Sequence, residues 1–175
     1  RGATAYVTLE PCSHHGKTAP CAQALIDAGV ARVVIATQDD DARVNGRGIA
    51  MLRDAGIKVS VGLHEDAARA DNAGFFCRTD LGRPMLTLKL ANSFDGRIAT
   101  GTGESQWITD APARRLTHAM RARHDAVMVG AGTARKDDPS LTVRGLGVAQ
   151  QPARVVVSRR LDLPLMGQLA RTAAE

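Results

Sequence analysis

The feature that most restricts the fold is a buried-strand pattern that alternates with helical patterns along the first half of the chain. Residues 30–37 form an almost unbroken run of apolar and β-branched residues, which is typical of a strand covered on both faces of a parallel sheet. Further strand patterns occupy residues 4–9 and 57–63, and helical spacing covers residues 20–28, 48–55 and 65–78. This alternation predicts an α/β fold with a mostly parallel sheet and helices packed over it.

A composition break at residues 80–84 predicts a linker, and the alternation restarts beyond it. We expect a glycine-rich loop over residues 95–103 and a helix over residues 110–123, with Thr109 as its N-cap. The other expected elements are strands over residues 85–91, 125–129 and 153–158 and a short turn or helix over residues 133–137. The sequence therefore predicts two domains, which we place at residues 1–82 and 83–175.

Two cysteines are the strongest functional signal. Cys12 follows the first expected strand and Cys21 opens the first expected helix, and a proline precedes each of them. Thiolates suit Zn²⁺, and a catalytic zinc site keeps three protein ligands and one open position for water. Nucleobase deaminases use a site of this kind. On spacing alone, two buried or incidental thiols are an alternative.

The whole run over residues 11–21, Pro-Cys-Ser-His-His-Gly-Lys-Thr-Ala-Pro-Cys, resembles the deaminase half of the bifunctional riboflavin-biosynthesis deaminase/reductase family. The resemblance implies that Cys12 and Cys21 are two of three zinc ligands. It also implies that His14 and Lys17 approach the ribose phosphate of the substrate. A lysine charge and an imidazole donor are chemically suited to a phosphate.

The sequence departs from the family pattern in two places. Where the family has Asp-Pro-Asn before Gly-Arg-Gly, residues 39–42 read Asp-Asp-Asp-Ala, so Asp41 replaces the asparagine. In addition, none of the five histidines is followed two positions later by glutamate, although the third zinc ligand and the general acid/base of the family form such a His-x-Glu. We therefore expect both residues to lie outside these 175 residues, with the sequence beginning inside a domain.

The second half carries polar and glycine-rich segments at residues 88–97, 103–109, 129–133 and 137–144. Glycines after a buried strand let backbone N–H groups approach an anion, although a structural turn explains Gly-x-Gly-Thr equally well. Together these segments resemble the reductase half of the same family, a dihydrofolate-reductase-like domain that uses NADPH. The resemblance to both halves extends from residue 1 to about residue 160.

The resemblance assigns roles to several residues of the second half. Cofactor contacts fall to Ala91, Trp107, Thr133 and Asp137, and substrate contacts fall to Ser105, Arg121, Leu141 and Arg144. The two arginines would face the substrate phosphate, and Lys89 would lie at the floor of the site as the candidate catalytic residue. Residue type alone allows other interpretations. A single tryptophan such as Trp107 is often a core residue, and Arg121 and Arg144 are typical of a solvated surface. Asp138 before Pro139 is typical of a turn.

Composition restricts the remaining function classes. The sequence has no run of the ~18 apolar residues that a membrane span needs, and three cysteines, an odd number, favour a reducing cytosol over a disulfide framework. The net charge of +5 comes from scattered basic residues, and one Trp, one Tyr and three Phe provide few stacking platforms for a nucleic-acid strand. Anionic phosphate ligands explain the charge more simply.

These observations predict a cytoplasmic, homo-oligomeric enzyme of riboflavin biosynthesis that uses Zn²⁺ and NADPH. By resemblance, the first domain hydrolytically deaminates a diaminopyrimidinone ribosylamino phosphate, and the second reduces the ribose of the product to a ribityl chain. No nucleic-acid or membrane partner is expected. Two alternatives stay open: a reductase-only protein that keeps the zinc ligands as structure, and a nucleic-acid-binding zinc module. An upstream His-x-Glu would favour the enzyme with both activities, whereas salt-sensitive nucleic-acid binding would favour the zinc module.

Overall fold

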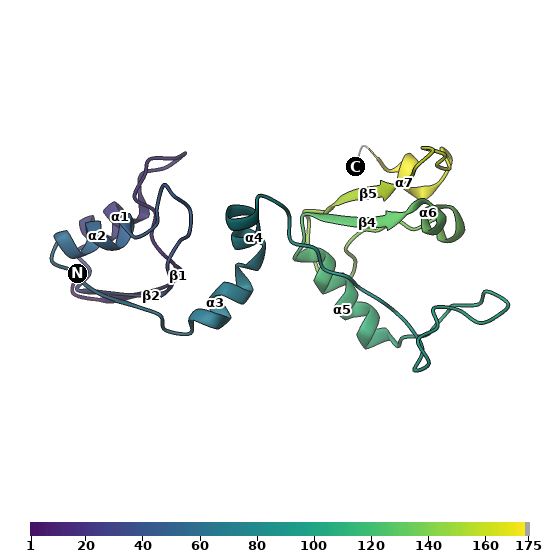
Figure 1. The fold of residues 1–175 in the computed structure, drawn as a ribbon, viewed down its shortest axis with the longest axis horizontal. Coiled ribbons are helices and arrows are strands. Elements are labelled where there is room, and N and C mark those ends of the chain that lie inside the picture. Colours follow the sequence, from purple (N-terminus) through teal and green to yellow (C-terminus); the bar gives the residue numbers. More distant parts are fainter. Residues whose placement is uncertain (174–175) are drawn as a thin grey trace. The chain divides into compact units, whose positions relative to one another are not determined.

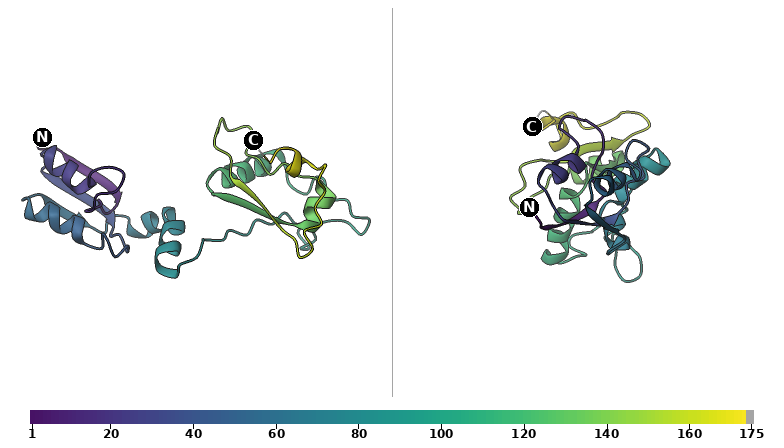
Figure 2. Two further views of the ribbon diagram at one scale, coloured as in Figure 1. Left: turned by 90° about the horizontal axis from the view of Figure 1, so that it is seen from above. Right: turned by 90° about the vertical axis from the view of Figure 1, so that its left-hand side faces the viewer.

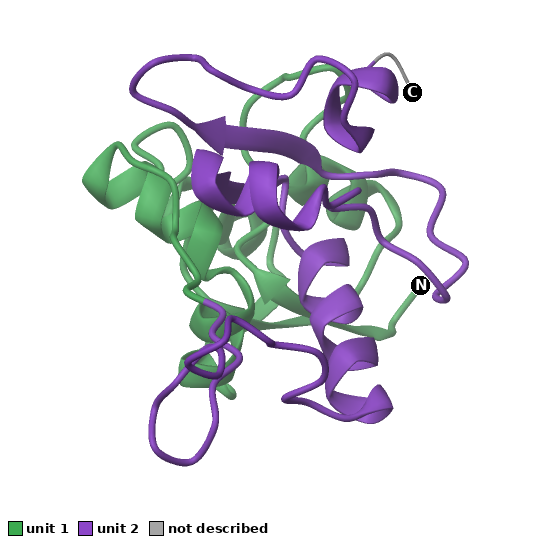
Figure 3. Cartoon of the chain, turned by 90° about the vertical axis from the view of Figure 1, so that its right-hand side faces the viewer, with its two compact units in different colours: residues 1–88 green, residues 89–175 purple. Residues whose placement is uncertain are grey.

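The computed structural model describes residues 1–173. The chain divides into two compact units, Arg1–Leu88 and Lys89–Glu175, which Figure 3 distinguishes by colour. Each unit is a small α/β assembly with parallel strands, as the alternation of strand and helix patterns predicts. No helix in the described part of the chain is long and apolar enough to cross a membrane.

Unit 1 is built on a three-stranded parallel sheet in the order β1-β2-β3. Its strands are β1 (Thr4–Leu9), β2 (Arg32–Thr37) and β3 (Lys58–Val61). The helices that connect them are α1 (Cys21–Asp27) and α2 (Arg47–Asp54), which lie on one face of the sheet (Figure 1). Parallel neighbouring strands require such crossover helices, which carry the chain back to the end of the sheet where the preceding strand began.

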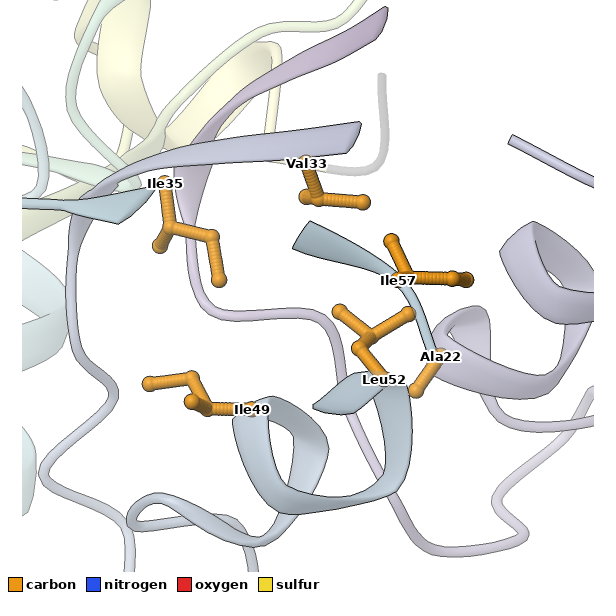
Figure 4. Packing of buried hydrophobic residues seen from close by; sticks show 6 residues of the cluster. All are labelled: Ala22, Val33, Ile35, Ile49, Leu52 and Ile57. Atoms are coloured by element: carbon orange, nitrogen blue, oxygen red, sulfur yellow. The ribbon is translucent and has the colours of Figure 1, made fainter. Parts of the chain in front are cut away.

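The core of unit 1 lies between the sheet and the helices α1 and α2 (Figure 4). Its buried members are Ala22, Val33, Ile35, Ile49, Leu52 and Ile57. Because successive side chains of a strand point to opposite faces, Val34 of β2 lies on the other face. There it lines a shallow pocket together with Ala67 and Ala68, which belong to the helix that follows β3. Burial on both faces explains why β2 has an almost continuous apolar sequence.

The prediction of one helix over residues 65–78 is wrong, because the segment forms two helices. The structure has α3 (Glu65–Asp71) and α4 (Ala73–Leu81), separated at Asn72. The Asn72 side-chain amide donates to the carbonyl of Ala68 at 2.9 Å, which is the competition with backbone hydrogen bonding that makes asparagine unfavourable inside helices. In turn, α4 extends into the predicted linker and ends at Gly82, whose φ of 63° is the left-handed conformation typical of a helix end.

Unit 2 contains one parallel strand pair, formed by β4 (Ala126–Gly130) and β5 (Ala153–Val157). Its helices are α5 (Ala111–Ala122), α6 (Ala131–Asp137) and α7 (Gln168–Arg171). The N-cap of α5 is Asp110 rather than the predicted Thr109, since the Asp110 carboxylate accepts the backbone N–H of Ala113 at 2.9 Å. A carboxylate at this position also interacts favourably with the helix dipole.

The predicted strand over residues 85–91 is not formed in the described structure. The segment is extended coil, which Figure 2 shows leading from α4 into unit 2. Leu86, Leu88 and Leu90 are 77%, 82% and 65% exposed. A strand exists only where a neighbour completes its backbone hydrogen bonds, and no strand within residues 1–173 pairs with this segment.

Candidate functional site

Cys12 and Cys21 meet where β1 ends and α1 begins. The backbone N–H of Cys21 donates to Sγ of Cys12 at 3.2 Å, and the N–H of Ala22 donates to the Cys12 carbonyl at 3.1 Å. Pro20, the N-cap of α1, provides no side-chain hydrogen bond, so Cys12 satisfies these donors instead. The thiolate is the form of cysteine that binds metal, and Sγ of Cys12 lies at the start of α1, where the backbone N–H of Cys21 reaches it.

The two sulfur atoms are chemically suited to share a cation. A hydrogen bond with Cys12 is the main cause that raises the pKa of Cys21, followed by burial and by the charge on a Cys12 thiolate. Two neighbouring thiols resist ionising together, and a divalent cation bound to both removes that penalty. Within residues 1–173 no group of three or more His, Cys, Asp and Glu side chains could hold a metal ion. This part of the chain therefore offers two thiolates toward a zinc site.

The loop between the cysteines carries His14 and Lys17. His14 is half-buried, and its Nδ1 atom is buried without a hydrogen-bond partner within the described residues. A buried polar atom of this kind is normally satisfied by a ligand or water. Lys17 is exposed. The assignment of both side chains to a substrate phosphate stays a prediction.

Asp41, the replacement for asparagine in the loop before α2, is engaged within that loop. Its carboxylate lies 2.6 Å from the Arg43 guanidinium. Hydrogen bonds from the side chain and backbone of Arg43 hold the pKa of Asp41 below its usual range. An asparagine could not form this ion pair, so the substitution gives the loop a contact that the family pattern does not contain.

Glu10 is an anchor that our sequence analysis missed. Its side chain is buried, and its carboxylate accepts backbone N–H groups of Gly46, Gly48 and Ile49 at 2.9, 2.9 and 3.1 Å. These donors open α2, where a negative charge is favoured by the helix dipole. Glu10 thus fixes the N-terminus of α2 against the strand end from which Cys12 extends. A glutamate next to a Pro-Cys pair is a weak signal, because the long-range contact depends on the fold.

We expect Gly48→Ala to destabilise the protein, because a methyl group there would collide with the Pro11 carbonyl and crowd the Glu10 carboxylate. Overpacking of this kind costs about 1–3 kcal/mol. The matched control is Gly74→Ala in α4, where a methyl group meets no atom within 4 Å and should stabilise the helix by about 0.5–1 kcal/mol. Urea denaturation of both variants checks the pair, and equal stabilities would contradict the close packing.

Unit 2 contains a cavity of about 1120 Å³. Every residue that the resemblance assigns to the reductase site lines it: Lys89, Ala91, Ser105, Trp107, Arg121, Thr133, Asp137, Leu141 and Arg144. Small-molecule pockets usually measure about 300–1,000 Å³, so the cavity has room for more than one ligand. The structure brings these side chains together, and their individual roles stay predictions.

Arg121 and Arg144 give the cavity an anion-binding character. Arg121 is half-buried, and burial followed by the charge of Arg144 lowers its pKa below the ordinary value. It donates to the Thr142 carbonyl at 3.1 Å, and Arg144 donates to the Ser140 hydroxyl at 3.1 Å. Neither guanidinium forms a salt bridge with a carboxylate in the described part of the chain. Two uncompensated guanidiniums are suited to a phosphate.

Trp107 is a cavity residue and not a core residue, since 69% of it is exposed. The guanidinium of Arg114 lies 4.4 Å from the centre of its indole ring and donates to the Thr109 carbonyl at 2.6 Å. Arg114 therefore orients the indole through a cation–π contact. Sequence reasoning missed Arg114 because nothing but its place on the α5 face distinguishes it from a surface arginine.

The segment after α6 has two non-glycine residues in the left-handed conformation. Asp138 has a φ of 39° and accepts the backbone N–H of Gln168 at 2.6 Å. Leu141 has a φ of 55° and is buried. Backbone strain of this kind is concentrated at functional sites, and here it places Leu141 in the cavity wall.

Comparisons with known proteins agree with this division into two sites. Residues 1–37 match the cytidine and deoxycytidylate deaminase zinc-binding region, and residues 84–175 match the RibD C-terminal domain. The fold and the two matches define an α/β protein that joins a deaminase zinc-binding region to a second, different α/β domain. The predicted fold class, a cytidine-deaminase-like domain followed by a dihydrofolate-reductase-like domain, is confirmed.

The chain belongs to the RibD family. It is 46% identical over 172 residues to the riboflavin biosynthesis protein RibD of Aquifex aeolicus, covering 98% of this chain and 48% of that protein. It is 49% identical over 165 residues to RibD of Escherichia coli K12, covering 94% of this chain and 45% of that protein. The chain therefore spans about half the length of the curated relatives that it matches.

Solved structures of relatives have the same fold. Acinetobacter baumannii RibD, form 1, has a TM-score of 0.89 at 46% identity, covering 98% of this chain and 50% of that chain. A diaminohydroxyphosphoribosylaminopyrimidine deaminase/5-amino-6-(5-phosphoribosylamino)uracil reductase from Thermotoga maritima has a TM-score of 0.83 at 43% identity, covering 91% and 45% of the two chains. The resemblance found in the motifs thus extends through the fold of both units.

Proposed function

We propose that this chain acts in riboflavin biosynthesis as a zinc-dependent pyrimidine deaminase and an NADPH-dependent reductase, divided between residues 1–82 and 83–175. The observation that carries the proposal is the unit 2 cavity, which the predicted cofactor residues line together with two arginines that form no salt bridge with a carboxylate within residues 1–173. The names of the Aquifex and Thermotoga relatives support the pathway and the two activities. We place the enzyme in the cytoplasm as a homo-oligomer, and three free cysteines suit a reducing compartment.

In the first domain, zinc when bound would supply an activated water for attack on the ring carbon that carries the amine. Cys12 and Cys21 would hold the metal as thiolates, and the backbone N–H of Cys21 at the start of α1 donates to Sγ of Cys12. Glu10 keeps Cys12 on a rigid strand end through its bonds to α2. His14 and Lys17 would bind the ribose phosphate of the substrate.

In the second domain, bound NADPH would supply the hydride that reduces the ribose to a ribityl chain. Arg121 and Arg144 would hold the substrate phosphate, with Ser105 and Leu141 as further substrate contacts. Lys89 would lie near the sugar. The cofactor would lie against Ala91, Trp107, Thr133 and Asp137, which all line the cavity.

Replacing Asp137 by alanine should weaken NADPH binding. A carboxylate repels the phosphates of the cofactor, so Asp137 belongs at the nicotinamide-ribose end, where it can accept hydrogen bonds from hydroxyl groups. Loss of one such bond should raise the Kd for NADPH roughly threefold to tenfold, as measured by titration calorimetry of the full-length protein. Asp125→Ala, outside the cavity, is the control. An unchanged Kd for Asp137→Ala would remove Asp137 from the cofactor site.

A second candidate is a reductase that keeps the cysteine pair as structure, since the Cys12 sulfur accepts the backbone N–H of Cys21 within unit 1. Incubating the full-length protein with the diaminopyrimidine substrate separates the two. Release of ammonium supports the proposed function. NADPH oxidation with the deaminated substrate, without any release of ammonium from the diaminopyrimidine, supports the second candidate.

A further inference from the structure

His118 is a cavity residue to which the family resemblance assigns no role. It lies on α5, one turn before Arg121, and lines the same cavity as Arg121 and Arg144. Residues three apart on a helix share a face, so α5 presents the imidazole and the guanidinium to the same side. That side meets the segment over residues 140–144.

Two contacts from α5 hold this segment. The Nδ1 atom of His118 accepts the backbone N–H of Arg144 at 3.2 Å. The Arg121 guanidinium donates to the Thr142 carbonyl at 3.1 Å. Elsewhere the segment is held by Gln151, which accepts the N–H of Val143 at 2.7 Å and donates to its carbonyl at 3.3 Å, and by Arg154, which donates to the Ser140 carbonyl at 3.4 Å. At Arg144 itself, His118 holds the backbone N–H, and the guanidinium donates to the Ser140 hydroxyl at 3.1 Å. The local backbone position of Arg144 therefore depends on the contact with His118.

This contact exists in one protonation state of the imidazole. A nitrogen accepts a hydrogen bond only while it carries a lone pair, and both ring nitrogens of a protonated histidine are donors. We infer that His118 is a positioning residue of the phosphate site: its neutral imidazole holds the backbone N–H of Arg144, and protonation releases that N–H. This inference rests on the proposed function, because it concerns the same arginine pair.

The charges around His118 favour its neutral form. Burial is the main cause that lowers the pKa of His118, followed by the charges of Arg121 from α5 and Arg144 from the facing segment; hydrogen bonding to the Thr142 carbonyl acts in the opposite direction. Other charged groups that line the cavity are Lys89, Arg114, Lys136, Asp137 and Asp138.

The sign of the pH dependence follows from this direction. Since the folded state binds the His118 proton less readily than the unfolded chain, the neutral arrangement is fully stable above the ordinary value of 6.5. Its stability decreases as the pH falls below that value. Acid should therefore weaken the grip on the phosphate through His118, because the guanidiniums of Arg121 and Arg144 stay protonated in acid.

The test uses the full-length protein and ribose 5-phosphate as the probe, with titration calorimetry at pH 7.5 and pH 5.5. His118→Ala removes the acceptor and should weaken binding roughly tenfold at pH 7.5. His118→Asn can accept the same N–H through its Oδ1 atom and does not titrate, so binding at pH 7.5 should be close to that of the wild type. NADPH affinity should be unchanged in both variants.

The comparison at pH 5.5 separates a positioning role from a merely structural one, because only a titrating acceptor makes the affinity for the probe depend on pH. The probe's own phosphate titrates equally for every variant, so the wild type should lose more affinity than His118→Asn, by up to about tenfold because the pKa of His118 lies below 6.5. Equal losses of affinity in the wild type and His118→Asn would overturn the inference. This comparison does not depend on whether His118→Ala folds. If His118→Ala binds like the wild type while Arg121→Ala does not, only the role of His118 fails. If Arg121→Ala also retains binding, or the wild type does not bind the probe, the proposed phosphate site itself is contradicted.

Discussion

The variants Cys12→Ala and Cys21→Ala should lose bound zinc and release no measurable ammonium from the diaminopyrimidine substrate. Each change removes one of the two thiolates that this part of the chain offers to the metal. Disturbing the residues that merely orient metal ligands already costs about 10- to 100-fold in affinity or activity, so loss of a ligand should exceed that range. Zinc content by atomic absorption and ammonium release by an enzymatic assay measure both effects.

Two controls make this result specific. Cys77→Ala removes the remaining thiol, which lies in α4 away from the pair, and should keep both zinc and deamination. The reduction of the deaminated substrate should survive in Cys12→Ala, because every described residue that lines the cavity of unit 2 belongs to that unit. A double Cys12→Ala, Cys21→Ala protein that deaminates at the normal rate would contradict the zinc assignment.

The variants Arg121→Ala and Arg144→Ala should each reduce kcat/KM for the reduction by roughly 10- to 150-fold. Each removes a charge-assisted contact to the substrate phosphate worth about 1.5–3 kcal/mol, and about 1.36 kcal/mol corresponds to a tenfold change. The affinity for NADPH should hardly change, since the arginines face the substrate in this arrangement. Steady-state kinetics with the deaminated substrate, together with calorimetric titration of NADPH, measures both quantities.

The matched control is Arg115→Ala, which removes a guanidinium from the same helix outside the cavity. It should leave kcat/KM within the error of the wild type. If Arg121→Ala and Arg144→Ala weakened NADPH binding and left the affinity for substrate intact, these two arginines would belong to the cofactor site instead.

Strands that show their burial as a run of apolar residues could be predicted from the sequence. The strand over residues 4–9 is found with these bounds, and the buried run over residues 30–37 contains β2. Helix ends were predicted less well, because caps depend on single side chains: Asn72 divides one expected helix and Asp110 replaces Thr109 as the N-cap of α5. The strand expected over residues 85–91 shows that alternation is not sufficient without a pairing partner.

The same distinction applies to the sites. Cys12 and Cys21 are brought together by a helix that starts nine residues after Cys12, so a local motif was enough to find them. Glu10 acquires its role from backbone groups 36, 38 and 39 positions away in the sequence. Arg114 acquires its role from the indole ring of Trp107, and His118 from the backbone N–H of Arg144. Such contacts follow from the fold and leave no mark in the sequence nearby.

The central claim is that two separable sites act in succession, and mixing two variants tests it most directly. Cys12→Ala and Arg121→Ala proteins are each supplied with the diaminopyrimidine substrate and NADPH, and the ribityl product is measured by mass spectrometry. We predict almost no ribityl product from Cys12→Ala alone. With Arg121→Ala alone the deaminated intermediate should accumulate, because its reduction is roughly 10- to 150-fold less efficient. Mixing the two variants should restore product formation. Ribityl product formed by Cys12→Ala alone at the normal rate, or no recovery in the mixture, would contradict the account.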